Sequence, residues 1–371
     1  MALATNDGTP LCEFKYNYMD VLDENLIIGV SYDEANVHSD LISLDTGRIL
    51  LSFESHIGAA HIADALAVQD NEQGNVTFYE YDKLLMGEAV ERAKLLDTWM
   101  NYTVSEDLIV VQSMQKSYLA DSTGALRFGP YEGLDEGCSE GLCSVMVGSK
   151  WGYIDRSGSF VIPPQYDYAM TFHEGCAIVM DNSKTSTGAY ALIDKTGKTL
   201  VDQCFNINRF GKNELYTTVT RLNDHYESIT YSLDKQGNLR EIGPYDVWDS
   251  AFKGVVVVSA YGEKTDVGLI DLASGEWSVN TGKYYSIFRT YNYYAADRVS
   301  DFMYIGQYQY KGRWLYDIMD ARGNVVLGEL NNVDYADSMR AIVQKGFSYG
   351  MMDMHGNWMY KQTIFTRPST D

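Results

Sequence analysis

Two serines of this sequence lie in the pattern Gly-x-Ser-x-Gly, which in hydrolases places a nucleophilic serine on a sharp turn between a strand and a helix. The two copies are Gly137-Cys138-Ser139-Glu140-Gly141 and Gly346-Phe347-Ser348-Tyr349-Gly350. Neither is followed by a helical pattern, and the chain has 32 glycines, so chance matches are expected. We therefore predict no catalytic residue at either serine.

Metal and acid–base chemistry are weakly indicated. His56 and His61 lie near Asp64 and approximate a metal site, but an ordinary surface or loop role is favoured. No Walker loop, zincin motif or EF-hand loop is present. The 51 acidic residues guarantee carboxylate pairs in space, so glycoside chemistry stays open without being indicated. We predict no metal and no cofactor.

The five cysteines are an odd number: Cys12, Cys138, Cys143, Cys176 and Cys204. Reduced thiols packed as small apolar side chains are the favoured interpretation, because Cys behaves as a small hydrophobe. A disulfide between Cys138 and Cys143 is the alternative.

Aromatic residues concentrate between Asp271 and Asp320, and a loop rich in them would suit recognition, because tyrosine stacks on ligands while its hydroxyl stays hydrated. Lys283 and Arg289 add cations that would attract a carboxylate. Ordinary strand packing remains the stronger interpretation of the tyrosines as a whole. The predicted binding residues are Tyr284, Tyr285, Arg289, Tyr291, Tyr293 and Tyr294.

A repeated turn reveals the elements that position these residues. Aspartate followed by two residues and glycine closes an apolar run six times, and three looser copies begin at Asp45, Asp82 and Asp271. The Asp side chain can accept hydrogen bonds from backbone amides ahead of it, and Gly supplies the positive φ of a bulged hairpin. The full copies begin at Asp121, Asp155, Asp194, Asp234, Asp320 and Asp353.

Strands are expected on both sides of each turn, with a further strand upstream. The upstream strands are predicted at Leu26 to Val30, Leu108 to Val111, Leu142 to Val147, Cys176 to Met180, Val255 to Ser259 and Met339 to Val343. This gives an all-β protein of about nine units of roughly 38 residues, each with three strands and room for a fourth. The segment Gly87 to Met100 has helical spacing, so a short helix is an alternative to a strand there.

We predict that the units close into a β-propeller of seven or eight blades, with the ninth turn shared between the chain ends; an open β-solenoid-like stack is the alternative. The units form one continuous domain, 1–371. Repeats are degenerate over 1–110 and best matched over 111–280, an insertion covers 281–315, and the final repeats span 316–371.

One repeat resembles a known family. The run Lys150-Trp151-Gly152-Tyr153-Ile154-Asp155, with Pro163, Pro164, Tyr166 and Phe172 after it, is similar to the bacterial WG-repeat family, also called KWG repeats. Other repeats keep fragments such as Gly243-Pro244-Tyr245-Asp246. The resemblance implies β-strand repeats in secreted or envelope-associated proteins and no catalytic residue. In this motif we expect Trp151 and Tyr153 to be buried between adjacent repeats.

Charge excludes one class of partner. With 29 basic and 51 acidic residues the formal charge is −22, so nucleic acid and anionic lipid would be repelled. No apolar stretch is long enough to span a membrane, and no leader is evident. We predict an extracellular or envelope-associated monomer that binds a protein, peptide or glycan through its inter-strand loops. A carbohydrate-active hydrolase or lyase on a propeller is the alternative.

Overall fold

The computed structural model describes residues 10–363 except 14, 34–35, 114, 185–187, 250, 261, 263–266, 290–302 and 337–338. Within these residues the helices are the five-residue α1 (Tyr81–Leu85) and a short 3-10 turn, η1 (Asn182–Lys184). No helix in this described portion has the length and apolar character needed to cross a membrane. The remaining regular structure is β-strand.

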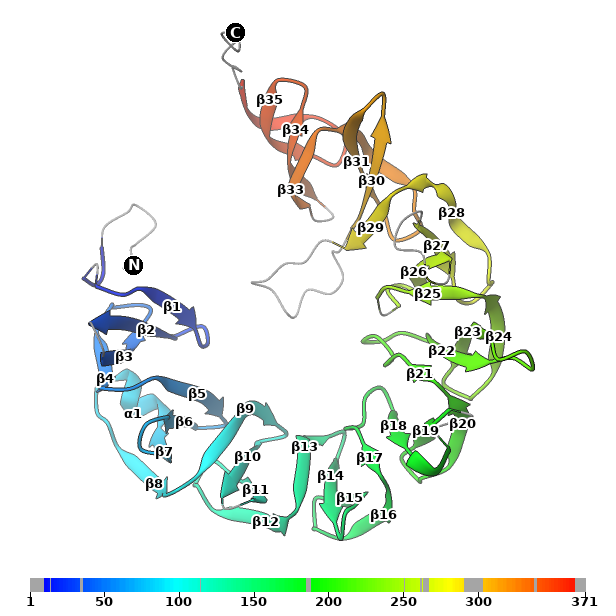
Figure 1. The fold of residues 1–371 in the computed structure, drawn as a ribbon. Coiled ribbons are helices and arrows are strands. Elements are labelled where there is room, and N and C mark those ends of the chain that lie inside the picture. Colours follow the sequence, from blue (N-terminus) through cyan, green and yellow to red (C-terminus); the bar gives the residue numbers. More distant parts are fainter. Residues whose placement is uncertain are drawn as a thin grey trace. The chain divides into compact units, whose positions relative to one another are not determined.

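The strands of the described residues form nine four-stranded sheets, each made of strands that follow one another in the sequence (Figure 1). The first four sheets are β1 (Tyr18–Val21), β2 (Leu26–Asp33), β3 (Asn36–Ser43) and β4 (Ile49–Phe53); β5 (Ile57–Ile62), β6 (Ala65–Asp70), β7 (Asn75–Glu80) and β8 (Glu91–Leu95); β9 (Trp99–Ser105), β10 (Leu108–Ser113), β11 (Lys116–Ala120) and β12 (Leu126–Tyr131); and β13 (Gly133–Ser139), β14 (Leu142–Val147), β15 (Lys150–Asp155) and β16 (Phe160–Tyr166).

The other five sheets repeat the same order. They are β17 (Tyr168–Ala169), β18 (Cys176–Met180), β19 (Tyr190–Asp194) and β20 (Thr199–Cys204); β21 (Asn206–Ile207), β22 (Tyr216–Leu222), β23 (Ser228–Asp234) and β24 (Leu239–Gly243); β25 (Tyr245–Val247), β26 (Val255–Ala260), β27 (Val267–Asp271) and β28 (Trp277–Tyr284); β29 (Ser286–Arg289), β30 (Tyr304–Tyr310), β31 (Arg313–Met319) and β32 (Val325–Leu330); and β33 (Asn332–Ala336), β34 (Arg340–Lys345), β35 (Ser348–Asp353) and β36 (Trp358–Thr363).

The predicted all-β repeat is confirmed, with nine repeats and four strands in each. The turn at Asp353 joins β35 to β36 inside a complete sheet, so no turn has to be shared between the chain ends. The chain folds as two compact units, 1–180 with 195–197, and 181–194 with 198–371, and both contain the same kind of sheet. A single continuous domain, and ring closure or an open stack, stay predictions.

The core of each compact unit lies between consecutive sheets, and the second strand of a sheet contributes to two cores at once. Successive side chains of a strand point to opposite faces. Ile109 and Val111 of β10 pack with the sheet β5–β8, whereas Leu108 and Val110 pack with the sheet β13–β16. A strand buried on both faces favours apolar residues at most positions, which explains the apolar runs that predicted these strands, although Ser144 of β14 is a buried exception.

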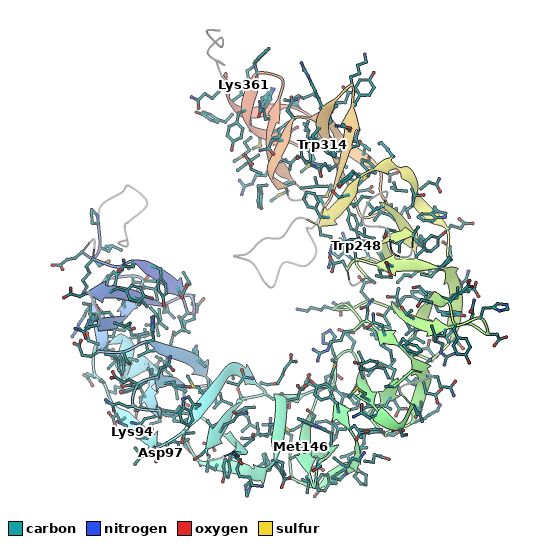
Figure 2. All side chains as sticks on the ribbon, viewed as in Figure 1. Lys94, Asp97, Met146, Trp248, Trp314 and Lys361 are labelled. Carbon is teal, nitrogen blue, oxygen red and sulfur yellow. A yellow bond between two sulfur atoms is a disulfide. The ribbon has the colours of Figure 1, made fainter. Side chains whose placement is uncertain are left out.

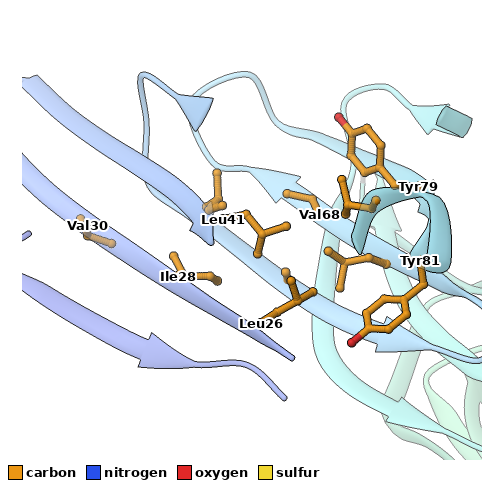
Figure 3. Packing of buried hydrophobic residues seen from close by; sticks show 11 residues of the cluster. Leu26, Ile28, Val30, Leu41, Val68, Tyr79 and Tyr81 are labelled. Atoms are coloured by element: carbon orange, nitrogen blue, oxygen red, sulfur yellow. The ribbon is translucent and has the colours of Figure 1, made fainter. Parts of the chain in front are cut away.

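The first two sheets show this packing in detail (Figure 3). Leu26 and Ile28 of β2 and Leu41 of β3 meet Val68 of β6. Tyr81 of α1 closes one end of the cluster, and its hydroxyl donates to the Asp23 carboxylate at 2.7 Å. The helix α1 thus adds apolar surface to a core that two sheets already share.

The repeated turn joins the third and fourth strands as predicted. In the turn after β15, the Oδ1 atom of Asp155 accepts hydrogen bonds from the amides of Ser157 (2.8 Å) and Ser159 (3.1 Å). The hydrogen bond from the Ser157 hydroxyl, and then these amide bonds, lower the pKa of Asp155 because they favour its ionised form. Gly158 has φ +82°, a conformation that side chains disfavour.

Of the helix and the strand considered for 87–100, the strand is correct and the helix is wrong. Helix α1 ends before this segment, at Leu85, and the segment contains β8 and the start of β9. Strand β8 pairs with β7 from Tyr79 to Val76. As β8, the segment supplies the fourth strand of the sheet. The pairing with β7 outweighs the weak helical propensity of its residues.

Replacement of a turn glycine tests the hairpin assignment. Gly197 has φ +84°, and a Cβ there would lie 3.3 Å from Ile162. Gly197→Val should lower the free energy of unfolding by about 1–3 kcal/mol, because a β-branched residue is strained at positive φ. Gly197→Asn places the same Cβ near Ile162 but tolerates this φ, so it should cost clearly less. Equal urea midpoints for the two variants would contradict the assignment.

Candidate functional site

The Trp-Gly motif serves packing. A Cβ on Gly152 would lie 2.5 Å from the carbonyl oxygen of Ile162, so no side chain fits there. Tyr153 is fully buried and its hydroxyl donates to the Met170 carbonyl at 2.7 Å, which confirms its predicted burial. Trp151 is partly buried, in keeping with the mostly buried indole that we expected, and it packs against Gly133, where a Cβ would lie 3.2 Å from the ring.

The cysteines correct another expectation. Cys138 and Cys143 face each other across the hairpin of β13 and β14 and form a disulfide. The prediction of reduced thiols is wrong for this pair, because residue 138 lies within a strand and the tight hairpin brings it opposite residue 143. It is confirmed for Cys176 and Cys204, which are buried thiols, while Cys12 is a partly exposed thiol.

Counting thiols tests the disulfide. Iodoacetamide added to the unfolded, unreduced protein should modify three of the five cysteines, and all five after reduction. Reduction should also lower the free energy of unfolding by about 2 kcal/mol, since the bond closes a short loop in the unfolded chain. Cys204→Ser is the control and should leave both the disulfide and the effect of reduction in place. Modification of all the cysteines without reductant would contradict the pairing.

The histidine, aspartate and serine residues considered for metal binding or catalysis have ordinary structural surroundings. His61 stacks on Tyr81 with ring centroids 3.8 Å apart. Asp64 accepts two hydrogen bonds from Arg92, each 2.8 Å long, and these lower the pKa of its carboxyl to about 2. Ser139 and Ser348 lie on strands of hairpins, and no helix follows either of them.

The predicted binding tyrosines do not share one environment. Tyr291, Tyr293 and Tyr294 lie outside the described residues. Tyr284 is 2% exposed, so it cannot serve as an open stacking surface. Tyr285 is 50% exposed and remains available.

The two predicted cations are engaged by carboxylates. Arg289 forms a mostly buried ion pair with Asp249, with Nε 2.5 Å from Oδ2. The Nζ atom of Lys283 lies 3.0 Å from Oδ2 of Asp317. Sequence reasoning had no means of placing these distant carboxylates beside the cations.

Asp317 is the centre of a buried cluster. It accepts a hydrogen bond of 2.8 Å from the hydroxyl of Tyr284, and one of 3.1 Å from the amide of Glu329. Burial, and then the hydrogen bond to Asp317, raise the pKa of Tyr284, so the tyrosine stays neutral and donates. Burial also raises the pKa of Tyr308 to about 12.

The same cluster recurs in the first sheet. Asp40 accepts from Tyr16 at 2.6 Å and from Ser52 at 2.6 Å, and Lys15 lies 2.8 Å away. In both clusters a Lys-Tyr pair precedes the sheet. A glycine in the second strand makes room for the tyrosine ring: a Cβ on Gly29 would lie 2.7 Å from the ring of Tyr16, and one on Gly306 would lie 2.5 Å from the ring of Tyr284.

Strand register shows what these aspartates replace. Each stands one residue before a third-strand residue that pairs with the fourth strand: Asp40 before Leu41, which pairs with Leu51, and Asp317 before Ile318, which pairs with Leu327. Gly152 has the same place before Tyr153, which pairs with Ile162. Asp40 and Asp317 therefore stand at the position of the glycine of the Trp-Gly motif.

Removing one buried charge tests this cluster. Burial opposes ionisation of Asp40, but hydrogen bonds from Lys15, Ser52 and Tyr16 outweigh it and hold its pKa below the usual value of about 3.9. At pH 7 Asp40→Asn should lower the free energy of unfolding by roughly 1–3 kcal/mol.

The pH dependence follows from the lowered pKa. The stabilisation by ionised Asp40 is present above the ordinary pKa and is lost as pH falls through the folded-state value. The urea midpoints of wild type and Asp40→Asn should therefore converge as pH falls below about 4. Asp33→Asn, on the exposed end of β2, is the control. A constant difference at all pH values would contradict the ionised state.

An exposed group of aromatic and cationic residues lies where β30 and β31 meet. We call it the aromatic edge and define it as Tyr285, Tyr310, Lys311, Arg313 and Trp314. Its aromatic members are 50%, 56% and 43% exposed in that order, and Trp314 is labelled in Figure 2. The rings of Tyr285 and Trp314 meet edge to face at 5.2 Å.

A tight turn holds the aromatic edge in place. Lys311 and Gly312 have φ +50° and +77°, as in the two-residue hairpin turns that fit the twist of paired strands. Tyr310 and Arg313 pair across this turn, and the Lys311 ammonium lies 5.1 Å from the Tyr310 ring centre. Among the described residues Arg313 makes no ion pair, so its guanidinium is available. The sequence signal that we missed is a Lys-Gly turn flanked by aromatic residues.

Comparisons with known proteins agree with the repeat. The family described as "WG containing repeat" matches residues 151–184, so the chain contains a WG repeat. No curated protein matches the chain.

Several solved structures are similar to it at low identity. A eukaryotic initiation factor is 10% identical over 88% of this chain and 93% of its own, with a TM-score of 0.48. AztD from Citrobacter koseri is 10% identical over 75% and 90%, with a TM-score of 0.31. A puromycin hydrolase mutant is 11% identical over 82% and 58%, with a TM-score of 0.31. Likeness at this level says nothing of what this chain does.

Proposed function

We propose that this protein is a non-catalytic binding module, and that the aromatic edge binds an acidic peptide segment of a partner protein. The observation that carries the proposal is the exposure of Tyr285, Tyr310 and Trp314 beside the available Arg313. Tryptophan, tyrosine and arginine are the residue types that dominate binding energy at protein interfaces.

Charge supports an acidic ligand. The chain has a formal charge of −22, and most of its surface repels carboxylates. Lys311 and Arg313 lie within three residues of each other, on a hairpin, without a carboxylate partner in the described part of the chain. A guanidinium can bind a carboxylate through two parallel hydrogen bonds, and the neighbouring rings add stacking area.

Rigidity supports binding as well. The positive φ values fix the hairpin, and the contact of Tyr285 with Trp314 limits the rotamers of both rings. A surface that is ordered before binding loses less conformational entropy when a ligand arrives.

An extracellular or envelope location is part of the proposal. The Cys138–Cys143 disulfide supports it, because disulfides persist in oxidising compartments and are rare in the cytosol. A WG repeat fits this location through the family resemblance.

A peptide array tests the proposal. Arrayed acidic peptides and their amide-substituted counterparts are incubated with wild type, Trp314→Ala and Arg313→Glu. Acidic peptides should bind wild type, and each variant should bind at least about tenfold more weakly, since hot-spot truncations cost more than about 1.4 kcal/mol. Binding should weaken with added salt.

Trp248→Ala is the matched control. Trp248 is 50% exposed, lies in the same compact unit and is not part of the aromatic edge (Figure 2). Its replacement should leave peptide binding unchanged. Equal binding of the amide-substituted peptides, or equal loss in the Trp248→Ala variant, would contradict the proposal.

A further inference from the structure

Another exposed tryptophan lies in the other compact unit and lines a polar pocket. Trp99 begins β9 and is 51% exposed. With Gln112, Ser113, Gln115, Lys116, Ser117 and Glu132 it lines a pocket of about 420 Å³. This volume is within the range of about 300–1,000 Å³ typical of small-molecule sites.

Hydrogen bonds hold the backbone on both sides of Trp99. The amide of Thr98 donates to the Gly74 carbonyl at 2.7 Å, and the amide of Met100 donates to the side chain of Gln69 at 2.8 Å. The six-membered part of the ring lies over Gly74, where a Cβ would be 3.4 Å away. One face of the indole is therefore supported by the protein, which fixes the ring before a ligand binds.

Apart from Trp99, every lining residue that the structure describes is polar. The side chains of Gln112 and Gln115 are exposed and make no hydrogen bond within the described part of the chain, so their amides are available to a ligand. Lys116 and Glu132 form an ion pair of 3.0 Å, and Glu132 also accepts from the amide of Gly148 at 3.3 Å. The hydrogen bond from Lys116 lowers the pKa of Glu132, which keeps the carboxylate ionised.

We infer that this pocket binds a neutral pyranose sugar ring. The flat, apolar C–H face of such a ring suits the open face of an indole, while its hydroxyl groups require both donors and acceptors. Amides supply both, and the Glu132 carboxylate supplies acceptors. Because Lys116 is already paired with Glu132, the pocket offers no unpaired cation for an anionic ligand, and this distinguishes it from the aromatic edge.

Three neutral disaccharides test the inference: cellobiose, maltose and chitobiose. Binding to the full chain is measured by saturation-transfer NMR and by tryptophan fluorescence. At least one should bind with millimolar or better affinity, with transfer strongest at the C–H protons of one ring. Trp99→Ala should weaken that binding at least about tenfold, and Glu132→Gln should weaken it less.

Two controls separate binding from folding. Trp248→Ala removes a tryptophan of matched exposure and should leave sugar binding unchanged. Trp99→Phe keeps an aromatic face and should retain part of the affinity if Trp99→Ala loses it. Absence of binding by all three sugars, or equal binding by wild type and a folded Trp99→Ala variant, would overturn the inference. Because this pocket and the aromatic edge share no residue, its failure would leave the proposed peptide site untouched.

Discussion

Burial of the second strand on both faces is the constraint on which the inner sheets depend; in the last sheet, β34 buries only Ala341 and Val343. Val255 and Val257 of β26 face one neighbouring sheet, while Val256 and Val258 face the other. A sheet alone would leave both faces of this strand open to water and would lose about 25 cal/mol for each Å² of apolar surface that the two neighbouring sheets bury. A single repeat is therefore not a folding unit, and stability has to come from stacking consecutive repeats.

The same constraint explains how the repeats diverge. The position of the glycine in the Trp-Gly motif is occupied in different ways, and where it is buried the occupant either lacks a side chain or has its polar atoms hydrogen-bonded. Gly152 takes the first solution, and the aspartates Asp40 and Asp317 take the second. Burying a carboxylate is costly unless it is paired and hydrogen-bonded. In these two repeats a lysine, a tyrosine and a glycine in the facing strand accompany the aspartate, so the repeat is hard to recognise in the sequence.

The sequence predicted the elements whose pattern is local. The Asp-to-Gly turns and the apolar second strands were correct because turn geometry and two-face burial act within a few residues. First strands were missed because some are very short, such as β17 and β21 with two residues each, and carry no pattern. The candidate site was predicted only in part. Tyr285 is exposed as expected, but the burial of Tyr284 and the ion pair of Arg289 depend on Asp317 and Asp249, whose positions only the fold determines.

Where ligands can bind follows from the same packing. If both faces of the inner strands are committed to neighbouring sheets, side chains can vary without cost to the core only at strand ends and hairpins. Trp99, opposite Gln112 near the end of β10, and Trp314, beside the turn between β30 and β31, both lie at the hairpin end that joins the second and third strands. Trp99 lies beside the amides of Gln112 and Gln115 and the ion pair of Lys116 with Glu132, whereas Trp314 lies beside the cations Lys311 and Arg313. The chemistry at this end can thus change from repeat to repeat while the stack that supports it stays the same, which is how one repetitive fold can carry two unlike binding sites.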